Sequence, residues 1–326
     1  MSNSNPPVLE IRDLTLCYEH GSQIAVDRAS FQLHAGQTLG LVGSSGAGKS
    51  TIARAICGLL PVTGGEILIN GVNKQQMSRQ QLMSARQRVQ IVFQEPGSSL
   101  SPKRTIEQIL LEPMIHFQIG EHCSRHQEIA GVLNTVGLET DILQRYPRQF
   151  STGQQQRIAI ARALVSEPDI LIADEAVSAL DVSVQAQILQ LLRTLQQQRN
   201  IALLFISHDL SVVRQIADRV AVMYQGQIME QAAADDFFNH AAHPYSQALL
   251  KMVNSDELLD LPVESNRLQH NRTSSDNEQR CLYAGNCVDK MPLCETSAAN
   301  IYNLGKSTGL HCVRCHLYRE ANENEI

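Results

Sequence analysis

The chain has 326 residues, of which 43% are hydrophobic and 18% charged, and its formal net charge is -6. The apolar content is too high for a disordered chain, and the acidic balance argues against a mainly electrostatic nucleic-acid binder, so we expect no nucleic-acid partner. The length exceeds the usual size of a single core and predicts one large domain with a smaller appendage.

The first residues contain no basic and apolar leader, and no stretch approaches the roughly 18 uncharged apolar residues of a membrane span. We therefore expect a chain that is neither exported nor membrane-spanning by itself. Two early segments, 8–18 and 23–37, alternate apolar and polar residues with a period of two. This alternation predicts antiparallel strands that precede the main sheet.

Apolar runs that are typical of strands then alternate with helical stretches, which predicts an α/β domain with a largely parallel sheet. The strand-like runs are 37–43, 88–94, 169–175 and 201–209, and the longest helical stretch is 183–200. From about residue 95 to about residue 165 the pattern is mainly helical, clearest at 105–117 and 126–138. We interpret this region as a helical insertion.

A glycine-rich motif, G-x-x-x-x-G-K-[ST], follows the first of these strands and precedes a helical run, which is the context it needs. Its residues are Gly43, Ser44, Ser45, Gly46, Ala47, Gly48, Lys49 and Ser50, and Thr51, which follows directly, is a further candidate nucleotide contact. Glycines let backbone N–H groups surround phosphates, and the following helix directs its positive end at them. We expect Lys49 to reach the β- and γ-phosphates of a nucleotide and Ser50 to ligate Mg²⁺.

The apolar run 170–173 ends in two carboxylates, Asp174 and Glu175. At the end of a strand Asp174 can hold Mg²⁺ through water, and Glu175 can polarise an attacking water as general base. Without an upstream P-loop, two surface acids after an ordinary strand would be the simpler interpretation. With it, we expect both side chains to act on a nucleotide.

The segment Ser151-Thr152-Gly153-Gln154 opens a helical run between these two motifs, and a helix N-terminus offers another cradle for a phosphate. It resembles the LSGGQ signature of ABC ATPases. Further residues match other motifs of that family in the same order, and they are Tyr18, Gln94, Asp181 and His208. The resemblance covers about residues 8–230, whereas a tyrosine or histidine taken alone would be an ordinary strand or loop residue.

The resemblance implies that two such subunits dimerise head to tail, so that each ATP lies between one P-loop and the other subunit's signature. It implies that Tyr18 stacks on adenine, that Gln94 senses Mg²⁺ and contacts membrane subunits, and that His208 steadies the γ-phosphate and the attacking water. Ser151, Gly153 and Gln154 then serve the partner's nucleotide. The family usually has glycine at Thr152, and because a β-branched residue limits backbone freedom we expect the site completed by this signature to be weakened.

The segment 240–250, which contains HPYSQALL, and the late Cys-His-Leu-Tyr resemble the ATP-binding subunits of dipeptide and oligopeptide importers, a branch that includes nickel uptake systems. Alone, HPYSQALL could merely start a helix with a proline in its first turn. The resemblance implies a second, paralogous ATP-binding subunit, two transmembrane permease subunits and an extracytoplasmic substrate-binding protein. It places the chain at the cytoplasmic face of the cell membrane as a peripheral subunit.

After residue 254 the sequence becomes polar and acidic, which predicts an ATPase domain at 1–254, a linker at 255–280 and a cysteine-rich segment at 281–326. The segment holds five of the eight cysteines, namely Cys281, Cys287, Cys294, Cys312 and Cys315. A cytosolic chain keeps its thiols reduced, so a cysteine cluster there indicates metal ligands rather than disulfides. The remaining Cys17, Cys57 and Cys123 are scattered and are expected to be small apolar fillers.

Four thiolates suit either a [4Fe–4S] cluster or a tetrahedral zinc ion, and unligated thiols are a third interpretation. In the resembled branch a similar spacing is associated with a [4Fe–4S] cluster. We take Cys281, Cys287, Cys294 and Cys315 as its ligands, with Cys312 as the alternative fourth. Because the tail lies far along the chain from Lys49 and Glu175, we expect ATP chemistry to survive loss of the metal centre.

These observations predict the ATP-hydrolysing subunit of an ABC importer for short peptides, in which Glu175, His208, Lys49 and Gln94 act on ATP. An importer of nickel or metal chelates is one alternative. A soluble ABC ATPase is another, but it would not need HPYSQALL, and a metal-sensing regulator would not need an intact Lys49, Asp174 and Glu175.

Overall fold

Two β-sheets organise the part of the chain that the computed structural model describes, which is residues 6–18, 23–254, 280–305 and 311–321. The smaller sheet has four strands in the order β2-β1-β4-β5, and all of its pairings are antiparallel. Its strands are β1 (Leu9–Tyr18), β2 (Gln23–Leu33), β4 (Gly64–Ile69) and β5 (Val72–Asn73). The period-two pattern at the start of the chain therefore indicated β1 and β2 correctly, whereas β4 and β5 were not predicted.

The larger sheet has eight strands in the order β11-β12-β10-β9-β3-β8-β7-β6. The strands β9, β3, β8, β7 and β6 are parallel, and the other three extend the sheet with antiparallel pairing. Their bounds are β3 (Thr38–Val42), β6 (Val89–Val92), β7 (Ile170–Asp174), β8 (Ala202–Ser207), β9 (Arg219–Tyr224), β10 (Gln227–Ala233), β11 (Ile301–Asn303) and β12 (Cys312–Arg314). The predicted α/β fold with a largely parallel sheet is confirmed.

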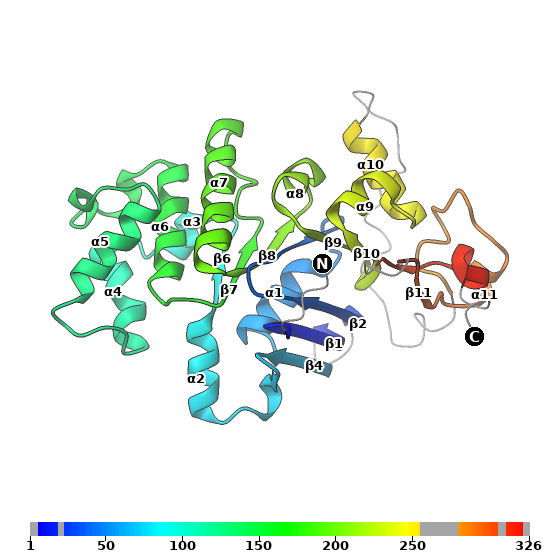
Figure 1. Ribbon diagram of the computed structural model, residues 1–326, viewed down its shortest axis with the longest axis horizontal. Helices are drawn as coiled ribbons and strands as arrows, with labels where there is room; N and C mark the ends of the chain where they lie inside the picture. The colour runs from blue at the N-terminus through cyan, green and yellow to red at the C-terminus, as the bar shows by residue number, and fades with distance from the viewer. Residues whose placement is uncertain (1–5, 19–22, 255–279, 306–310, 322–326) are drawn as a thin grey trace.

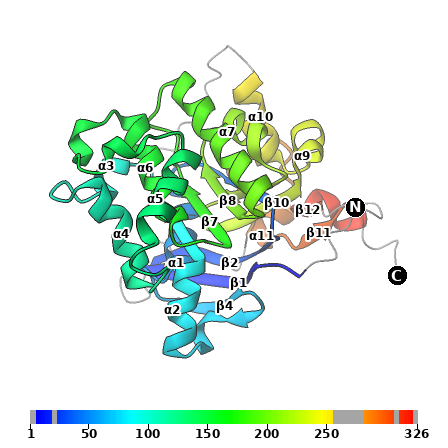
Figure 2. The same ribbon diagram turned by 60° about the vertical axis from the view of Figure 1, so that its left-hand side comes forward.

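Each face of the parallel strands contributes to a different hydrophobic core. In β7, Ile170 and Ile172 pack in the core that includes α1 (Lys49–Cys57) and the smaller sheet, while Leu171 and Ala173 pack in the other. The second core includes α7 (Val182–Arg199) and α8 (Leu210–Ile216). Figures 1 and 2 show α7 and α8 on one side of β7 and β8, and α1 with β1, β2 and β4 on the other.

The helical insertion lies at one end of the molecule, at the left of Figure 1. Its helices are α3 (Pro96–Ser99), α4 (Ile106–His116), α5 (Arg125–Thr135) and α6 (Thr152–Leu164), with short 3₁₀ turns η3 (Thr140–Ile142) and η4 (Pro147–Gln149). Before it, η2 (Lys74–Gln76) and α2 (Arg79–Arg88) follow the smaller sheet. In the insertion, α4 and α6 begin with reciprocal capping boxes, at Thr105 and at Ser151. These hydrogen bonds satisfy backbone N–H groups that have no partner within the helix.

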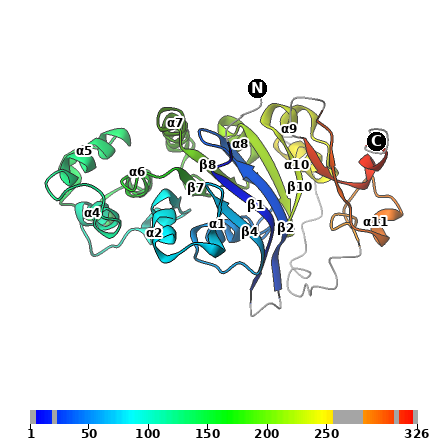
Figure 3. The ribbon, with the colours of Figure 1, turned by 60° about the horizontal axis from the view of Figure 1, so that its bottom comes forward.

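The C-terminal elements lie at the opposite end of the molecule (Figures 1 and 3). They are α9 (Ala234–His240), α10 (Pro244–Asn254), α11 (Leu293–Thr296), β11, β12 and η5 (His316–Ala321). The predicted linker lies outside the described residues except for Arg280. Within the described residues, no helix combines the length and the apolar composition that crossing a membrane requires.

The cysteine-rich tail is continuous with the main sheet, because β12 pairs antiparallel with β10. Glu230 faces Val313 in this pairing and Gln231 faces Cys312. The edge of a strand presents unpaired N–H and C=O groups. At this edge of β10 those groups pair with β12, and β12 in turn pairs with β11. The sequence did not reveal these two strands, since three residues are too few to show a period.

Candidate active site

The P-loop joins β3 to α1, and two of its glycines have backbone conformations that disfavour any other residue. Gly43 has a φ of 150° and Gly48 a φ of 104°. A Cβ atom at Gly43 would overlap the carbonyl oxygen of Met223, and one at Gly48 would meet that of Ala25. The glycine spacing that predicted the loop therefore reflects close approach by the neighbouring strands β9 and β2.

Lys49 extends into the concave side of this loop. Its Nζ donates hydrogen bonds of 2.8 Å to the carbonyl oxygens of Gly43 and Ser44, and the residue is only 4% exposed. Burial lowers the pKa of Lys49, while the carboxylates of Glu175 and Asp174 partly oppose that shift. The ammonium group is thus held by the loop and faces two acids.

The predicted Mg²⁺ site contains Ser50, in the first turn of α1, and Asp174, the last residue of β7. Ser50 Oγ donates a hydrogen bond of 2.8 Å to Asp174 Oδ1. Burial raises the pKa of Asp174, and the Ser50 hydrogen bond lowers it in part. Hydroxyl and carboxylate oxygens are the ligands that a hard cation such as Mg²⁺ prefers. The chemistry of this pair fits the ion.

Gln94, the third residue predicted for Mg²⁺, follows β6 and is exposed. Since β6 pairs parallel with β7, and Val92 faces Ala173, Gln94 lies at the same sheet edge as Asp174. Tyr18, at the end of β1, approaches this edge from the smaller sheet. Its hydroxyl is 3.0 Å from Thr51 Oγ1, which places the predicted adenine contact beside the P-loop.

Glu175 and His208 meet at the carboxyl ends of the adjacent parallel strands β7 and β8. Glu175 has a φ of 50°, and its N–H donates a 3.0 Å hydrogen bond to the carbonyl oxygen of Ile206. This left-handed conformation is uncommon for a residue other than glycine and clusters at functional sites. His208 Nδ1 lies 3.4 Å from Glu175 Oε1, so the imidazole can orient or share a proton with the carboxylate.

The signature segment begins α6 and is bonded to itself. Ser151 Oγ accepts the Gln154 N–H at 3.3 Å, and Gln154 Oε1 accepts the Ser151 N–H at 3.1 Å. Gly153 is buried, where a Cβ would crowd Val184, and Thr152 is exposed. Ser151, Thr152 and Gln154 are exposed, so three of the four signature residues lie on the surface.

Asp181, which matched another family motif, caps the next helix. Its carboxylate accepts the Val184 N–H at 3.0 Å and the Ser183 hydroxyl at 2.7 Å as α7 begins. The Val184 N–H and the Ser183 hydroxyl both lower the pKa of Asp181. The capping role gives this residue a structural function that the motif alone did not indicate.

One contact at the P-loop was not predicted. The backbone N–H of Ser44 donates a 3.1 Å hydrogen bond to the hydroxyl of Tyr245, which lies in the first turn of α10. Tyr245 belongs to HPYSQALL, which the sequence analysis singled out without assigning it a role. The two residues are 201 positions apart, and no periodic or spacing signal connects them.

Four of the five tail cysteines come together, and they are Cys281, Cys287, Cys294 and Cys315. The Cys281 N–H donates a 2.9 Å hydrogen bond to the Cys294 carbonyl oxygen. Burial chiefly raises the pKa of Cys315 to about 11, and the thiols of Cys281, Cys287 and Cys294 contribute to that rise. Cys312 lies apart on β12, where Arg219 is the charged group that acts on its pKa.

Within the described residues no three His, Cys, Asp or Glu side chains stand close enough to hold a single metal ion. Among the other cysteines, burial raises the pKa of Cys57 to about 12, as expected for a thiol packed against apolar groups. Cys123 is exposed, so its prediction as an apolar filler was wrong; a residue's type alone does not fix its burial.

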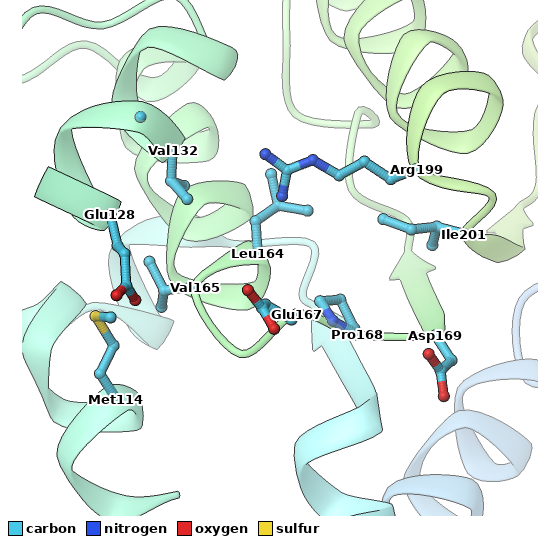
Figure 4. A pocket seen from close by; sticks show the side chains of 11 residues that line it. Met114, Glu128, Val132, Leu164, Val165, Glu167, Pro168, Asp169, Arg199 and Ile201 are labelled. Carbon is cyan, nitrogen blue, oxygen red and sulfur yellow. The ribbon is translucent and has the colours of Figure 1, made fainter. Parts of the chain in front are cut away.

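A cavity of about 530 Å³ lies between the helical insertion and the sheet (Figure 4). Its walls include Glu128 and Val132 of α5, Leu164 of α6, Asp169 before β7 and Arg199 at the end of α7. These residues stand at the amino ends of β7 and β8. The cavity is therefore at the opposite edge of the sheet from Asp174 and Glu175.

Residues 26–178 match the family model described as ABC transporter. The putative oligopeptide transport ATP-binding protein YkfD of Bacillus subtilis (strain 168) is 39% identical, with 98% of both chains aligned. The oligopeptide transport ATP-binding protein AppF of the same organism is 40% identical over 95% of this chain and 97% of its own. AmiF of Streptococcus pneumoniae serotype 4, similarly named, is 45% identical over 76% of this chain and 81% of its own.

Solved structures agree with these sequence relatives. The structure of cbiO1 from Clostridium perfringens, part of the ABC transporter complex cbiONQ, has a TM-score of 0.66 and 25% identity, covering 77% of this chain and 95% of that one. A dimeric post-hydrolysis state of the ATP-binding cassette MJ0796, bound to ADP and Pi, has a TM-score of 0.62 and 28% identity, covering 69% and 98%. The chain therefore belongs to the ABC transporter family, as one of its ATP-binding proteins.

Proposed function

We propose that this ATPase is the energy-supplying subunit of an importer for short peptides. The observation that carries the proposal is the meeting of Lys49, Ser50, Asp174 and Glu175 at one sheet edge. The relatives named for oligopeptide transport match nearly the whole chain, tail included, which favours peptides over nickel chelates as cargo. The P-loop would hold ATP, and Lys49 would exchange its loop carbonyls for the β- and γ-phosphates.

In this proposal Glu175 is the general base, because its carboxylate follows β7 directly and faces His208. The carboxylate accepts a proton from the attacking water, and His208 orients the carboxylate and the water relative to each other. Mg²⁺, when bound through Ser50 and Asp174, neutralises charge on the phosphates. In the same proposal Gln94, which follows β6 at this edge, senses the ion, and Tyr18, whose hydroxyl contacts Thr51, stacks on adenine.

The exposed signature supports a dimer in which Ser151, Gly153 and Gln154 complete the partner's nucleotide site. The similar cassette MJ0796 is described as dimeric with ADP and Pi bound, which supports a dimer here. We propose a second, paralogous ATP-binding subunit, two membrane permease subunits and an external substrate-binding protein as partners. ATP binding would then close the dimer at the cytoplasmic face of the membrane, and hydrolysis would reopen it.

Affinity purification of the tagged full chain from solubilised membranes tests this function. We expect permease chains and a second ATP-binding chain to co-purify, and the assembly to hydrolyse ATP faster when a peptide-loaded binding protein is added. Lys49→Ala should abolish that peptide-stimulated hydrolysis. Purification without any membrane chain, or stimulation by a nickel chelate and not by peptides, would contradict the proposal.

We also propose that Cys281, Cys287, Cys294 and Cys315 hold a metal centre, a [4Fe–4S] cluster. The four thiols lie together, and thiolates are the ligands that such clusters use. The resemblance to the importer branch, in which a similar cysteine spacing is associated with a [4Fe–4S] cluster, favours a cluster over zinc. The cluster would add ligand bonds that stabilise the fold of the tail.

Protein purified without oxygen tests the centre. We expect a brown protein with about four irons per chain, and loss of the colour in Cys294→Ser. Cys312→Ser is the matched control, because Cys312 lies apart from the other four, and it should stay brown. Zinc in place of iron would refute the cluster, and the absence of both metals would refute the metal centre.

A further inference from the structure

Three tyrosines from distant parts of the chain form one buried cluster beside the P-loop. Tyr224 ends β9, Tyr245 starts α10, and Tyr283 lies in the cysteine-rich tail. Ring centroids are 4.6 Å apart for Tyr224 and Tyr245, 5.3 Å for Tyr245 and Tyr283, and 5.4 Å for Tyr224 and Tyr283. Tilted and edge-to-face aromatic pairs at such distances attract one another beyond their burial.

Tyr245 connects this cluster to the nucleotide site through a single hydrogen bond. Its hydroxyl accepts the Ser44 N–H at 3.1 Å, while Lys49 Nζ donates to the Ser44 carbonyl oxygen at 2.8 Å. The same residue is thus held from the α10 side and from inside the loop. Gly43, next to it, has a φ of 150°, so the loop bends sharply where Tyr245 supports it.

The tail holds the start of α10 by contacts other than the tyrosine rings. The buried carboxylate of Glu230 accepts the N–H groups of Ala242 at 2.7 Å and His243 at 2.9 Å. The same carboxylate lies 2.8 Å from Nε2 of His311, in the tail. The Tyr318 hydroxyl donates a 3.0 Å hydrogen bond to the Ala242 carbonyl oxygen. The tail therefore binds the Ala242 carbonyl oxygen directly, through Tyr318, and it contacts through His311 the β10 carboxylate that binds the Ala242 and His243 N–H groups.

We propose that Tyr245 is a positioning residue for the P-loop, and that the cysteine-rich tail sets nucleotide affinity through it. The proposal rests on the proposed nucleotide site and adds a control of that site by the tail. Tyr245 acts through Ser44 and is not a catalytic residue. The separation of the tail from Lys49 along the chain does not correspond to separation in the fold. The inference thus replaces the expectation that the ATP site is indifferent to the tail.

The direction of the effect follows from preorganisation. A loop that is already bent to receive phosphates loses less conformational freedom on binding, so its affinity is higher. Tyr245→Phe removes one hydroxyl and keeps the ring cluster. A hydrogen bond between neutral groups contributes modestly, so we expect Kd for ADP with Mg²⁺ to rise about three- to tenfold.

Calorimetric titration of the full chain with ADP and Mg²⁺ measures this change without turnover. In the ATPase assay, Tyr245→Phe should raise KM for ATP by the same factor and leave kcat within about twofold, since Glu175 and His208 are untouched. A residue with only a structural role would instead lower the melting temperature and the active fraction without changing KM. An unchanged Kd in Tyr245→Phe would overturn the proposal.

Tyr283 tests the contribution of the tail. Tyr283→Leu removes the ring that contacts Tyr245 and should raise Kd for ADP, while Tyr283→Phe keeps the ring and serves as the matched control. If the tail acts through Tyr245, the double variant with Tyr245→Phe should weaken binding by less than the product of the single effects. A Tyr283→Leu protein with unaltered Kd, or strictly multiplicative effects, would refute the control by the tail.

The two proposals fail in different ways. If the proposed ATPase site is wrong, wild-type protein will not bind ADP with Mg²⁺, and Lys49→Ala will leave the titration unchanged. If only the present inference is wrong, wild-type protein will bind ADP, Lys49→Ala will weaken it, and Tyr245→Phe will match wild type.

Discussion

At the level of single residues, Glu175 and Lys49 have separable tasks in the proposed hydrolysis. Glu175 stands at the end of β7 in a left-handed conformation and faces His208, whereas Lys49 is enclosed by the P-loop. Glu175→Gln keeps the size and the hydrogen-bonding ability of the side chain but removes its basicity. We therefore expect the turnover of the full assembly to fall by about 10²- to 10⁴-fold, the usual contribution of a general base.

Nucleotide binding distinguishes the two tasks. Glu175→Gln should bind ATP as the wild type does, whereas Lys49→Ala should lose most of its affinity because the phosphates lose their cation. Both are measured on the assembly by equilibrium binding and by phosphate release. Wild-type turnover in Glu175→Gln would remove the residue from the role of base.

The pKa of His243 predicts how the free energy of unfolding depends on pH. Burial lowers the pKa of His243 to about 4 from its ordinary value of 6.5, and its Nδ1 accepts the Tyr245 N–H at 3.0 Å. The folded chain holds this imidazole neutral, so the unfolded chain binds more protons between these two values. Stability should fall as pH drops from about 6.5 to about 4, by on the order of 3 kcal/mol.

Urea unfolding of wild type and of His243→Asn across this pH range measures the effect. An asparagine side chain can accept the same N–H and does not titrate. The stability of His243→Asn should therefore vary less with pH than that of the wild type. Glu230 also loses its charge in acid. Burial acts to raise its pKa, but the hydrogen bonds from His311 and from two backbone N–H groups lower it overall. This loss of charge is common to the wild type and to His243→Asn. Parallel pH curves for the two proteins would show that His243 does not contribute.

The sequence predicted residues that act through a local motif and missed residues that act across the fold. The spacing from Gly43 to Thr51 is a property of one loop, and its placement after a strand could be read directly. The hydroxyl of Tyr245 on Ser44 depends on how α10 returns to β3, which no local pattern encodes. Among the cysteines, the sequence analysis preferred Cys315 and kept Cys312 as the alternative. In the fold the thiols of Cys281, Cys287 and Cys294 act on the pKa of Cys315, whereas Arg219 is the charged group that acts on that of Cys312.

At the level of elements, the start of α6 carries the departure from the family signature. Thr152 is the first residue of the helix and is exposed, directly after the Ser151 cap. If the partner is a different ATP-binding chain, we expect the composite site that receives this signature to hydrolyse more slowly than the other. Inactivating each P-loop lysine in turn, and measuring the remaining turnover of the assembly, compares the two sites.

Two substitutions isolate the cause of that asymmetry. Thr152→Gly should raise hydrolysis at the site facing this signature, since it restores backbone freedom next to the phosphate. Thr152→Ser removes only the branching methyl group and should raise it less. Equal loss of turnover after disabling either lysine, together with an inert Thr152→Gly, would leave no asymmetry to explain.

Elements with a clear local pattern, either a continuous apolar run or a helical period, were predicted from the sequence. Elements without such a pattern were not. β7 and β8 are buried on both sides and appear as continuous apolar runs, and α7 shows a helical pattern over 18 residues. β11 and β12 have three residues each and owe their existence to the open edge of β10. Their pairing is a tertiary effect, so the tail could be predicted as cysteine-rich but not as part of the main sheet.

At the level of the whole molecule, the main sheet joins the tail to the nucleotide site. β12 pairs with β10, β10 with β9, and β9 with β3, which leads into the P-loop. In Figure 1 the helical insertion with the signature lies at one end, and the cysteine-rich tail at the other. The nucleotide site lies between these two appendages. In the proposals above, the insertion completes a partner's nucleotide site and the tail supports this chain's own P-loop.

Reciprocity makes this arrangement testable from the nucleotide side. If the tail raises nucleotide affinity through Tyr245, bound nucleotide must stabilise the tail by the same coupling. We expect ADP with Mg²⁺ to slow hydrogen exchange at the P-loop and also at the N–H groups of Ala242 and His243 that bind Glu230. Exchange followed by mass spectrometry on the full chain resolves these segments. In Tyr245→Phe, the protection at the P-loop should remain while that at α10 and β12 disappears; protection confined to the P-loop in wild type would show that the tail and the site are not coupled.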